Sequence, residues 1–359
     1  MKKTAALFFA AFFFSVFAAA AVEPEQEQAE LAEPGPIEET ASGAKNSAWT
    51  FSLEGSFGAR VGAYNEIVWA KKKSDGERYK QSELNYELAP LFYTGVNFCA
   101  AYKRLELKFL SKFFYSQKSG SLTDSDWQND ATLGNGDIYT KTDYSEHSLY
   151  LNPQFAGIAG YDIEAQGAFK FHPTNFLTLA PLFSFNAQCM NFRAKGGYGW
   201  YGQYDKKRNH IPPYTDESSR LSFNFGTDPV LEYQVYNMFF WTGLRADFEI
   251  FPWMRVSLAS EISPLSILLD FDKHLTNHRD FSETAFSAFF AFRQSIKTEF
   301  KIQENFLICQ SCTFLITGES EGSMYLKKDS QSEYKRVSNN TGGNKMTYLD
   351  LELSAKILW

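Results

Sequence analysis

The last segment of the chain alternates between apolar and polar residues at every second position. In an extended strand over residues 348–359, one side would carry only apolar side chains, namely Leu349, Leu351, Leu353, Ala355, Ile357 and Trp359. The opposite side is mostly polar, with Asp350, Glu352, Ser354 and Lys356. This pattern is typical of a transmembrane strand whose apolar side faces lipid and whose polar side faces the interior of a barrel. A half-buried strand of a soluble sandwich would show the same alternation, but without an export signal and so many aromatic residues.

Similar short segments, rich in Phe, Tyr, Trp, Leu and Ala, recur from Trp49 to the end of the chain. They predict ten antiparallel strands at about residues 50–68, 83–98, 102–116, 146–170, 175–194, 227–249, 253–270, 283–300, 304–318 and 344–359.

The connections between these strands alternate in length. Short turns are expected at 99–101, 171–174, 250–252 and 301–303. Longer polar segments are expected at 69–82, 117–145, 195–226, 271–282 and 319–343. Bacterial outer-membrane barrels have this asymmetry, with short periplasmic turns and long extracellular loops. We therefore predict an all-β fold, a ten-stranded antiparallel transmembrane β-barrel whose two ends both lie on the periplasmic side.

The predicted strand 253–270 does not keep one alternation throughout. Counting back from Asp270 would leave Arg255 and Glu261 facing lipid. A β-bulge near Ser263 and Pro264 would correct this, because one extra residue exchanges the two faces of a strand.

The first 48 residues differ from the rest. Lys2 and Lys3, an apolar stretch and an alanine run predict a secretory signal peptide over 1–21. An uncleaved anchor is the alternative, although the apolar part is short for a membrane span. Residues 22–48 are acidic and rich in proline, so we predict a disordered periplasmic tether. Residues 49–359 then form the barrel.

Composition narrows the function further. The net charge of −7 does not indicate a protein that binds nucleic acid. The four cysteines do not form an evident disulfide framework, since Cys309 and Cys312 would point to opposite faces of one strand. We expect no metal, no cofactor and a monomer.

Two acidic clusters lie where strands are predicted to emerge from the membrane. They are Asp124-Ser125-Asp126-Trp127 and Asp270-Phe271-Asp272-Lys273-His274. In extended backbone, residues two apart share a face, so the carboxylates converge and Asp272 can orient the His274 ring. Facing each other across a barrel mouth, the clusters could hold and activate a water molecule. By themselves such clusters are more often solvated loops or cation-binding surfaces.

The order of motifs along the chain resembles the omptin family of ten-stranded outer-membrane endoproteases. The resemblance starts with Gly58, Gly62 and Glu66 in GARVGAYNE and continues with Ser82, Leu84 and Tyr86. It then takes in DSDW at 124–127, Ser145 and His147 in DYSEH, FRAKGG at 192–197 and DFDKH at 270–274.

The resemblance implies roles for six of the matched residues. Asp124 and Asp126 would form an acidic couple, and Asp272 and His274 a dyad that activates a water without a covalent intermediate. Two further residues, Glu66 and Asp270, would form the pocket for an Arg or Lys side chain of a peptide substrate.

Two features of the motifs leave alternatives. The pair Ser145 and His147 allows a serine nucleophile, which the acidic and histidine residues make unnecessary. Where the family places its lipopolysaccharide contacts, this chain has instead Phe185, Ala187, Cys189 and Tyr236. We therefore expect those lipid contacts to be absent.

The rival to an enzyme is a non-enzymatic barrel that acts as an adhesin or structural protein with degenerate omptin loops. A general porin is disfavoured because ten strands leave little room for an aqueous channel.

Overall fold

The computed structural model describes residues 49–71, 76–127, 146–151, 159–202, 217–218, 220–276, 278–287, 291–328, 331 and 333–359. The predicted signal peptide (1–21) and tether (22–48) lie outside these residues, so both remain predictions. Within the described ranges, no helix has the length and apolarity that crossing a membrane requires.

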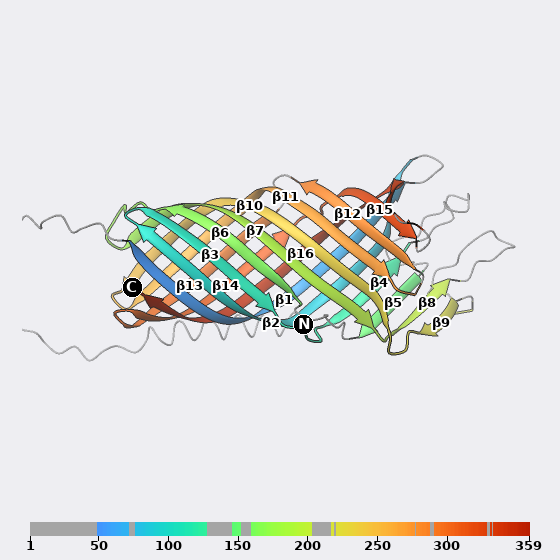
Figure 1. The fold of residues 1–359 in the computed structure, drawn as a ribbon, viewed down its shortest axis with the longest axis horizontal. Helices are drawn as coiled ribbons and strands as arrows, with labels where there is room; N and C mark the ends of the chain where they lie inside the picture. Colours follow the sequence, from blue (N-terminus) through green and yellow to red (C-terminus); the bar gives the residue numbers. More distant parts are fainter. Residues whose placement is uncertain are drawn as a thin grey trace, which may run out of the picture. The chain divides into compact units, whose positions relative to one another are not determined.

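Ten long antiparallel strands form a closed ring (Figure 1). In order round the ring they are β1 (Thr50–Lys71), β2 (Arg78–Tyr102), β3 (Leu105–Phe114), β6 (Gly160–Phe169), β7 (Leu177–Lys195), β10 (Pro229–Phe251), β11 (Met254–His274), β13 (Ala291–Gln303), β14 (Phe306–Thr317) and β16 (Lys335–Leu358). The last strand closes the ring on the first, from Ser52 opposite Leu358 to Ala70 opposite Asn340. The predicted ten-stranded barrel is confirmed.

Six shorter strands in the described part of the chain extend this sheet at one end of the barrel. β4 (Ser121–Asp126) pairs with β2, and β5 (Glu146–Leu151), β8 (Tyr198–Gly202) and β9 (Arg220–Asn224) follow it in order. On another part of the ring, β12 (Arg279–Ser287) and β15 (Gly322–Lys328) bridge β11 and β16. We call this end the long-loop end. The opposite end, where β1 begins and β16 ends, is the short-turn end.

The extensions correct the predicted loops. Parts of 117–145, 195–226, 271–282 and 319–343 are strands, and β11 continues to His274. Beyond the membrane a strand needs no apolar outer face, so its sequence lacks the alternation of a membrane strand and predicts a loop. Three of the four short turns also begin two to four residues later than predicted, because β2 ends at Tyr102, β10 at Phe251 and β13 at Gln303.

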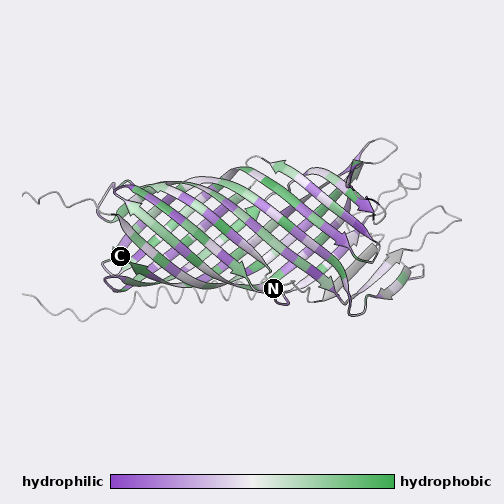
Figure 2. Cartoon of the chain, viewed as in Figure 1, coloured by the Kyte–Doolittle hydropathy of each residue, from purple (hydrophilic) through white to green (hydrophobic). Residues whose placement is uncertain are grey.

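The outward face of the barrel carries the apolar residues that the terminal alternation predicted. Leu353 and Trp359 are 61% and 60% exposed, whereas Asp350, on the opposite face, is 3% exposed. Hydrophobic and hydrophilic residues alternate along the strands in Figure 2. Aromatic rings gather at the short-turn end, where the centroids of Trp49 and Tyr102 lie 5.1 Å apart and those of Phe251 and Trp253 5.2 Å apart. Such a girdle marks a membrane interface.

The girdle also shows which residues lie beyond the membrane. A tilted strand crosses the hydrocarbon layer in about 9–11 residues. Counted from Trp253, the crossing on β11 therefore ends near Pro264, and Asp270–His274 lies beyond it. On β1 the same count places Glu66 beyond the layer, together with all of β4 and β12.

A bulge in β11 exchanges its two faces, as the sequence predicted. Phe240 pairs with Leu265 and Thr242 with Ile262, so Ser263 and Pro264 together oppose one residue of β10. Glu261 is buried below the bulge, and the buried positions above it are even-numbered. This shift is what turns Asp270 and Asp272 toward the interior.

Candidate active site

The acidic couple lies on β4, on the side of the sheet that faces the barrel interior. Asp124 pairs in register with Leu84 of β2, and Asp126 with Ser82. Leu122, two residues earlier on the same face, is fully buried in the interior cluster of apolar side chains. Burial raises the pKa of Asp124 well above its usual value, and the neighbouring charge of Asp126 raises it further.

The dyad lies at the end of β11. Nε2 of His274 lies 2.6 Å from Oδ2 of Asp272, and the ring contacts Phe281 edge-on with centroids 5.2 Å apart. Burial alone would lower the pKa of His274. The Asp272 carboxylate outweighs burial and raises it to about 9. The imidazole is therefore held in its charged form at neutral pH while the site is empty.

The couple and the dyad act on each other across the mouth of the barrel. The charges of Asp124 and Asp126 add to the rise in the pKa of His274, and His274 in turn lowers that of Asp124. β4 and β11 are separated by several strands in either direction round the ring. The structure thus brings together four of the predicted residues from distant parts of the chain.

The predicted pocket acids lie deeper in the barrel. Asp270 is fully buried; the Tyr233 hydroxyl donates to its Oδ2 at 2.9 Å, and the Glu283 backbone N–H donates to its Oδ1 at 2.9 Å. Burial raises the pKa of Asp270 to about 7. Glu66 is 2% exposed on β1, and burial together with surrounding carboxylates raises its pKa well above the usual range.

Two glycines explain why Glu66 is preceded by a G-x-x-x-G pattern. A Cβ on Gly58 would lie 2.4 Å from the Tyr93 ring. At Gly62 the backbone has φ = 155°, and a Cβ would lie 2.1 Å from the carbonyl oxygen of Thr347. Only glycine allows β1 to approach its neighbours this closely on the way to Glu66.

One residue of the pocket was missed by the sequence analysis. Glu283, on β12, pairs in register with Asp270 and is fully buried. No local motif marks it, because its neighbour is across a hairpin rather than along the chain. Placing the turn between His274 and Arg279 would have found it, since that register sets Asp270 opposite Glu283.

The accessory pair is less completely described. Ser145 lies outside the described residues, and for His147 only the backbone is described, with its Cα in register with Ser125. Within the described residues, no group of three or more His, Cys, Asp or Glu side chains is placed to hold a metal ion.

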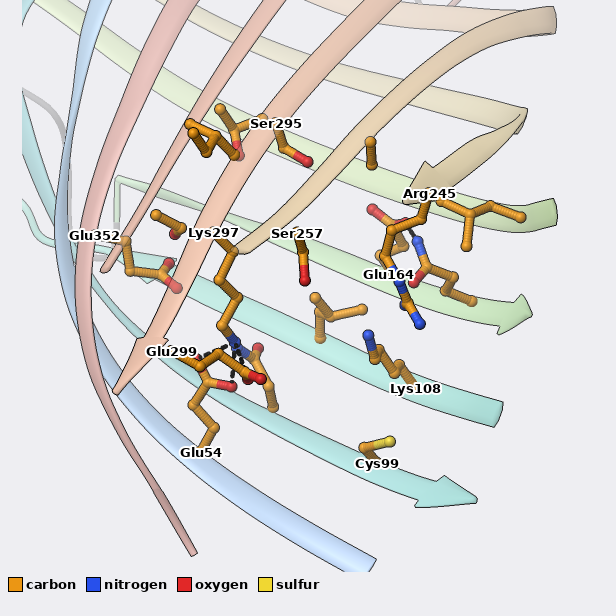
Figure 3. Close-up of a pocket in the computed structure, with 18 of the residues that line it drawn as sticks. Glu54, Cys99, Lys108, Glu164, Arg245, Ser257, Ser295, Lys297, Glu299 and Glu352 are labelled. Carbon is orange, nitrogen blue, oxygen red and sulfur yellow. Dashed lines mark hydrogen bonds and ion pairs between the residues drawn. The ribbon is translucent and has the colours of Figure 1, made fainter. Parts of the chain in front are cut away.

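Below the site, charged side chains fill the membrane-spanning part of the barrel around a cavity of about 250 Å³ (Figure 3). Lys297 lies 2.6 Å from Glu54 and 3.7 Å from Glu299. Higher up, Arg60 is 2% exposed and lies 2.7 Å from Asp350 and 2.9 Å from Asp162. These buried charges are paired, as the low dielectric of the interior requires.

Between this network and the mouth lies an aromatic layer. The ring centroids of Tyr86 and Phe192 are 4.4 Å apart, those of Tyr86 and Tyr233 5.3 Å, and those of Tyr64 and Tyr233 6.0 Å. The four rings belong to the main buried apolar cluster. They form the floor beneath the acidic pocket.

Fold and site define a class, a ten-stranded outer-membrane β-barrel with an acidic and histidine site at its long-loop end. The family model of the omptin family matches residues 47–355, and the chain belongs to that family of outer-membrane proteases. None of the curated proteins compared with the chain matches it.

The solved structure of an outer-membrane protease gives the same fold. The outer membrane protease OmpT of Escherichia coli superposes with a TM-score of 0.70 at 12% identity, over 86% of this chain and 97% of that one. The toluene transporter TodX of Pseudomonas putida reaches a TM-score of 0.28 at 8% identity, over 85% and 89% of the two chains. The outer membrane protein OprG of Pseudomonas aeruginosa also reaches 0.28, at 7% identity over 87% and 97%.

Proposed function

We propose that this chain is an endopeptidase that cleaves peptides at Arg or Lys residues by means of an activated water. The observation that carries the proposal is the electrostatic contact of the Asp272–His274 dyad with Asp124 and Asp126 across the barrel mouth. The omptin membership of the chain adds to it.

In the proposed reaction, His274 accepts a proton from a water held between the two pairs of residues. Asp272 orients the ring and stabilises the imidazolium that forms. The water attacks the peptide carbonyl directly, so no acyl-enzyme arises. Asp124, whose pKa is raised, is suited to carry a proton and donate to the developing oxyanion.

The resting state of the dyad favours cationic substrates. A histidine with a pKa of about 9 is mostly protonated at neutral pH and cannot act as a base. A positive substrate side chain near the carboxylates opposes that protonation and lowers the pKa of His274. Binding of Arg or Lys in the pocket of Glu66 and Asp270 would thus help to generate the neutral base.

The barrel interior supports an enzyme rather than a channel. The aromatic layer formed by Tyr64, Tyr86, Phe192 and Tyr233 fills the lumen below the pocket, and the ion pairs around Arg60 lie beneath it. In our proposal the barrel is a rigid support for the site. The long-loop end faces the outside of the cell, and peptides with basic residues are the substrates.

A quenched dibasic peptide tests the proposal. Purified, refolded protein should cleave it and spare a matched neutral peptide, and Asp124→Asn or His274→Ala should lower the rate about 10²–10⁴-fold. His172→Ala serves as the control, since His172 is exposed at the short-turn end and contacts Thr178. Unaltered cleavage by the Asp124 and His274 variants would defeat the mechanism and leave the adhesin hypothesis. Insensitivity to serine-directed covalent inhibitors should exclude a Ser145 nucleophile.

A further inference from the structure

Glu283 is a buried acid whose charge nothing in the described structure neutralises. Its side chain is fully buried, and no N–H or O–H group of the described residues donates to either carboxylate oxygen. On one side it contacts Gly342, where a Cβ would lie 1.6 Å from Oε1. Because a buried carboxylate without donors is costly, this residue has a reason to be there other than stability.

The groups that face Glu283 come from five strands, and the one from β10 is the Tyr233 hydroxyl. β11 supplies Asp270 and Asp272, and β1 supplies Glu66. From β15, the register neighbour is Met324, which is uncharged, and β16 contributes only the backbone of Gly342. The charged groups that act most strongly on Glu283 are therefore all acids.

Glu283 and Asp270 are not equivalent within this group. Asp270 accepts from the Tyr233 hydroxyl and from the backbone N–H of Glu283, so its ionised form is stabilised. Among the described residues, the carboxyl of Glu283 has only that of Asp270 as a hydrogen-bonding neighbour. Two carboxyls can form a hydrogen bond only if one of them carries a proton. In the empty pocket that proton belongs on Glu283, consistent with the pKa of Glu283, which burial and Asp270 raise well above its usual value.

We propose that Glu283 is a specificity-determining residue, the third carboxyl of the pocket, whose proton is displaced when a cationic substrate side chain binds. The proposal rests on the endopeptidase function above and deepens it. On binding, the O–H bond of Glu283 breaks, the proton leaves to solvent, and the new carboxylate accepts an N–H from the guanidinium or ammonium group. Charge balances, since one cation enters and one proton leaves.

The pocket should therefore bind neutral side chains weakly for two reasons. A neutral side chain brings no positive charge to offset the carboxylate charge of the pocket, and it cannot displace the proton from Glu283. Affinity for a cation should therefore rise with pH across the neutral range, with Glu283 contributing to the dependence beside Asp270, whose pKa is about 7. A pocket of Glu66 and Asp270 alone would bind the same cation without Glu283 contributing a proton.

Calorimetry of ligand binding tests this without measuring turnover. The probe is Nα-acetyl-arginine amide, with the neutral citrulline analogue as its control, titrated in two buffers of different ionisation enthalpy. His274→Ala is used as the background so that His274 cannot itself release a proton. In this background we expect net proton release at neutral pH, and Glu283→Gln should lower it by up to one proton, leaving the share of Asp270 and Glu66, and weaken binding about ten- to a hundredfold.

The outcomes separate this inference from the function on which it rests. Equal proton release and equal pH dependence with Gln at position 283 would overturn the role of Glu283 and leave the pocket intact. Equal binding of the arginine and citrulline amides would overturn the pocket and the role of Glu283 together. Glu283→Asp, which keeps a carboxyl, should retain proton release, and Glu283→Met, which also lacks a titratable group, replaces the Gln variant if that protein fails to fold.

Discussion

The contact between His274 and Asp272 governs how activity should depend on pH. The raised pKa of about 9 means that the neutral imidazole, which is the base in our proposal, accumulates only as pH rises toward that value. Deprotonation of Asp270, whose pKa is about 7, improves cation binding over part of the same range. We expect kcat/KM for a dibasic peptide to climb from about pH 6.5 to a plateau above the pKa of His274.

Asp272→Asn provides the check on that assignment. It removes the carboxylate that raises the pKa of His274, so the rise should move to lower pH while the maximal rate falls. Rate profiles of both proteins and NMR titration of the His274 ring measure the shift. A rate profile that rises at the same pH in the Asp272→Asn variant would contradict the assignment of Asp272 and His274 as a dyad.

At this scale the local sequence identifies most of the site. Asp124 and Asp126, and likewise Asp270, Asp272 and His274, repeat at a spacing of two, so one strand face collects them. This spacing does not predict the place of Glu283 in the site, because the position of a turn decides that Asp270 is its neighbour. A hairpin register depends on where the strands end, and the strand beyond the membrane has no apolar face to mark it.

Among the elements, the bulge in β11 decides whether the site exists. Below the bulge the odd-numbered Glu261 faces the barrel interior. Above the bulge the even-numbered Asp270 and Asp272 face the interior instead. Deletion of Ser263 should remove one of the two bulged residues and turn both aspartates outward. We expect loss of cleavage, together with a lower free energy of unfolding.

Pro264→Ala is the matched control for the deletion. It keeps the number of residues, so the register and the cleavage should both survive. Full activity of the deletion variant would contradict the role of the bulge. The sequence predicted this element because Arg255 and Glu261 would otherwise have faced lipid.

Strand existence was easier to predict than strand length. The alternation ending at Trp359 gave the correct lipid-facing side, and the apolar outer faces located all ten barrel strands. The upper extensions β4, β8, β9 and β15 lay in segments predicted as loops. Their outer faces are bathed by water, so hydrophobic periodicity does not distinguish them from loops.

For the whole molecule, the buried ion pairs tie distant strands of the barrel together. Arg60 on β1 joins Asp350 on β16 and Asp162 on β6, with its guanidinium 3.7 Å from the centroid of the Tyr348 ring. Arg60→Met leaves Asp162 without its cation and Asp350 with Lys112 alone, and should lower the free energy of unfolding by about 3–5 kcal/mol. Urea unfolding in detergent micelles measures this.

An exposed lysine gives the comparison for Arg60. Lys71→Met, at the exposed end of β1, should change the free energy of unfolding by less than about 0.5 kcal/mol. Equal stabilities of the two variants would show that the interior network does not hold the barrel together.

The outer surface of the barrel predicts how the protein depends on lipid. Where the family would place lipopolysaccharide contacts, Phe185 contacts Phe240 with ring centroids 5.0 Å apart, and Cys189 pairs in register with Tyr236. This surface offers aromatic contacts rather than cations for phosphate groups. We expect cleavage in detergent to proceed without lipopolysaccharide. A strict requirement for added lipopolysaccharide would refute this expectation.

The most direct test of the central claim is cleavage-site profiling of a peptide library with the wild-type protein and His274→Ala. We predict that the wild type cuts beside Arg or Lys and that these cuts disappear in the variant. Cuts without preference for basic residues, or an unchanged profile in His274→Ala, would contradict the claim that the barrel mouth is a peptidase site with an acidic pocket.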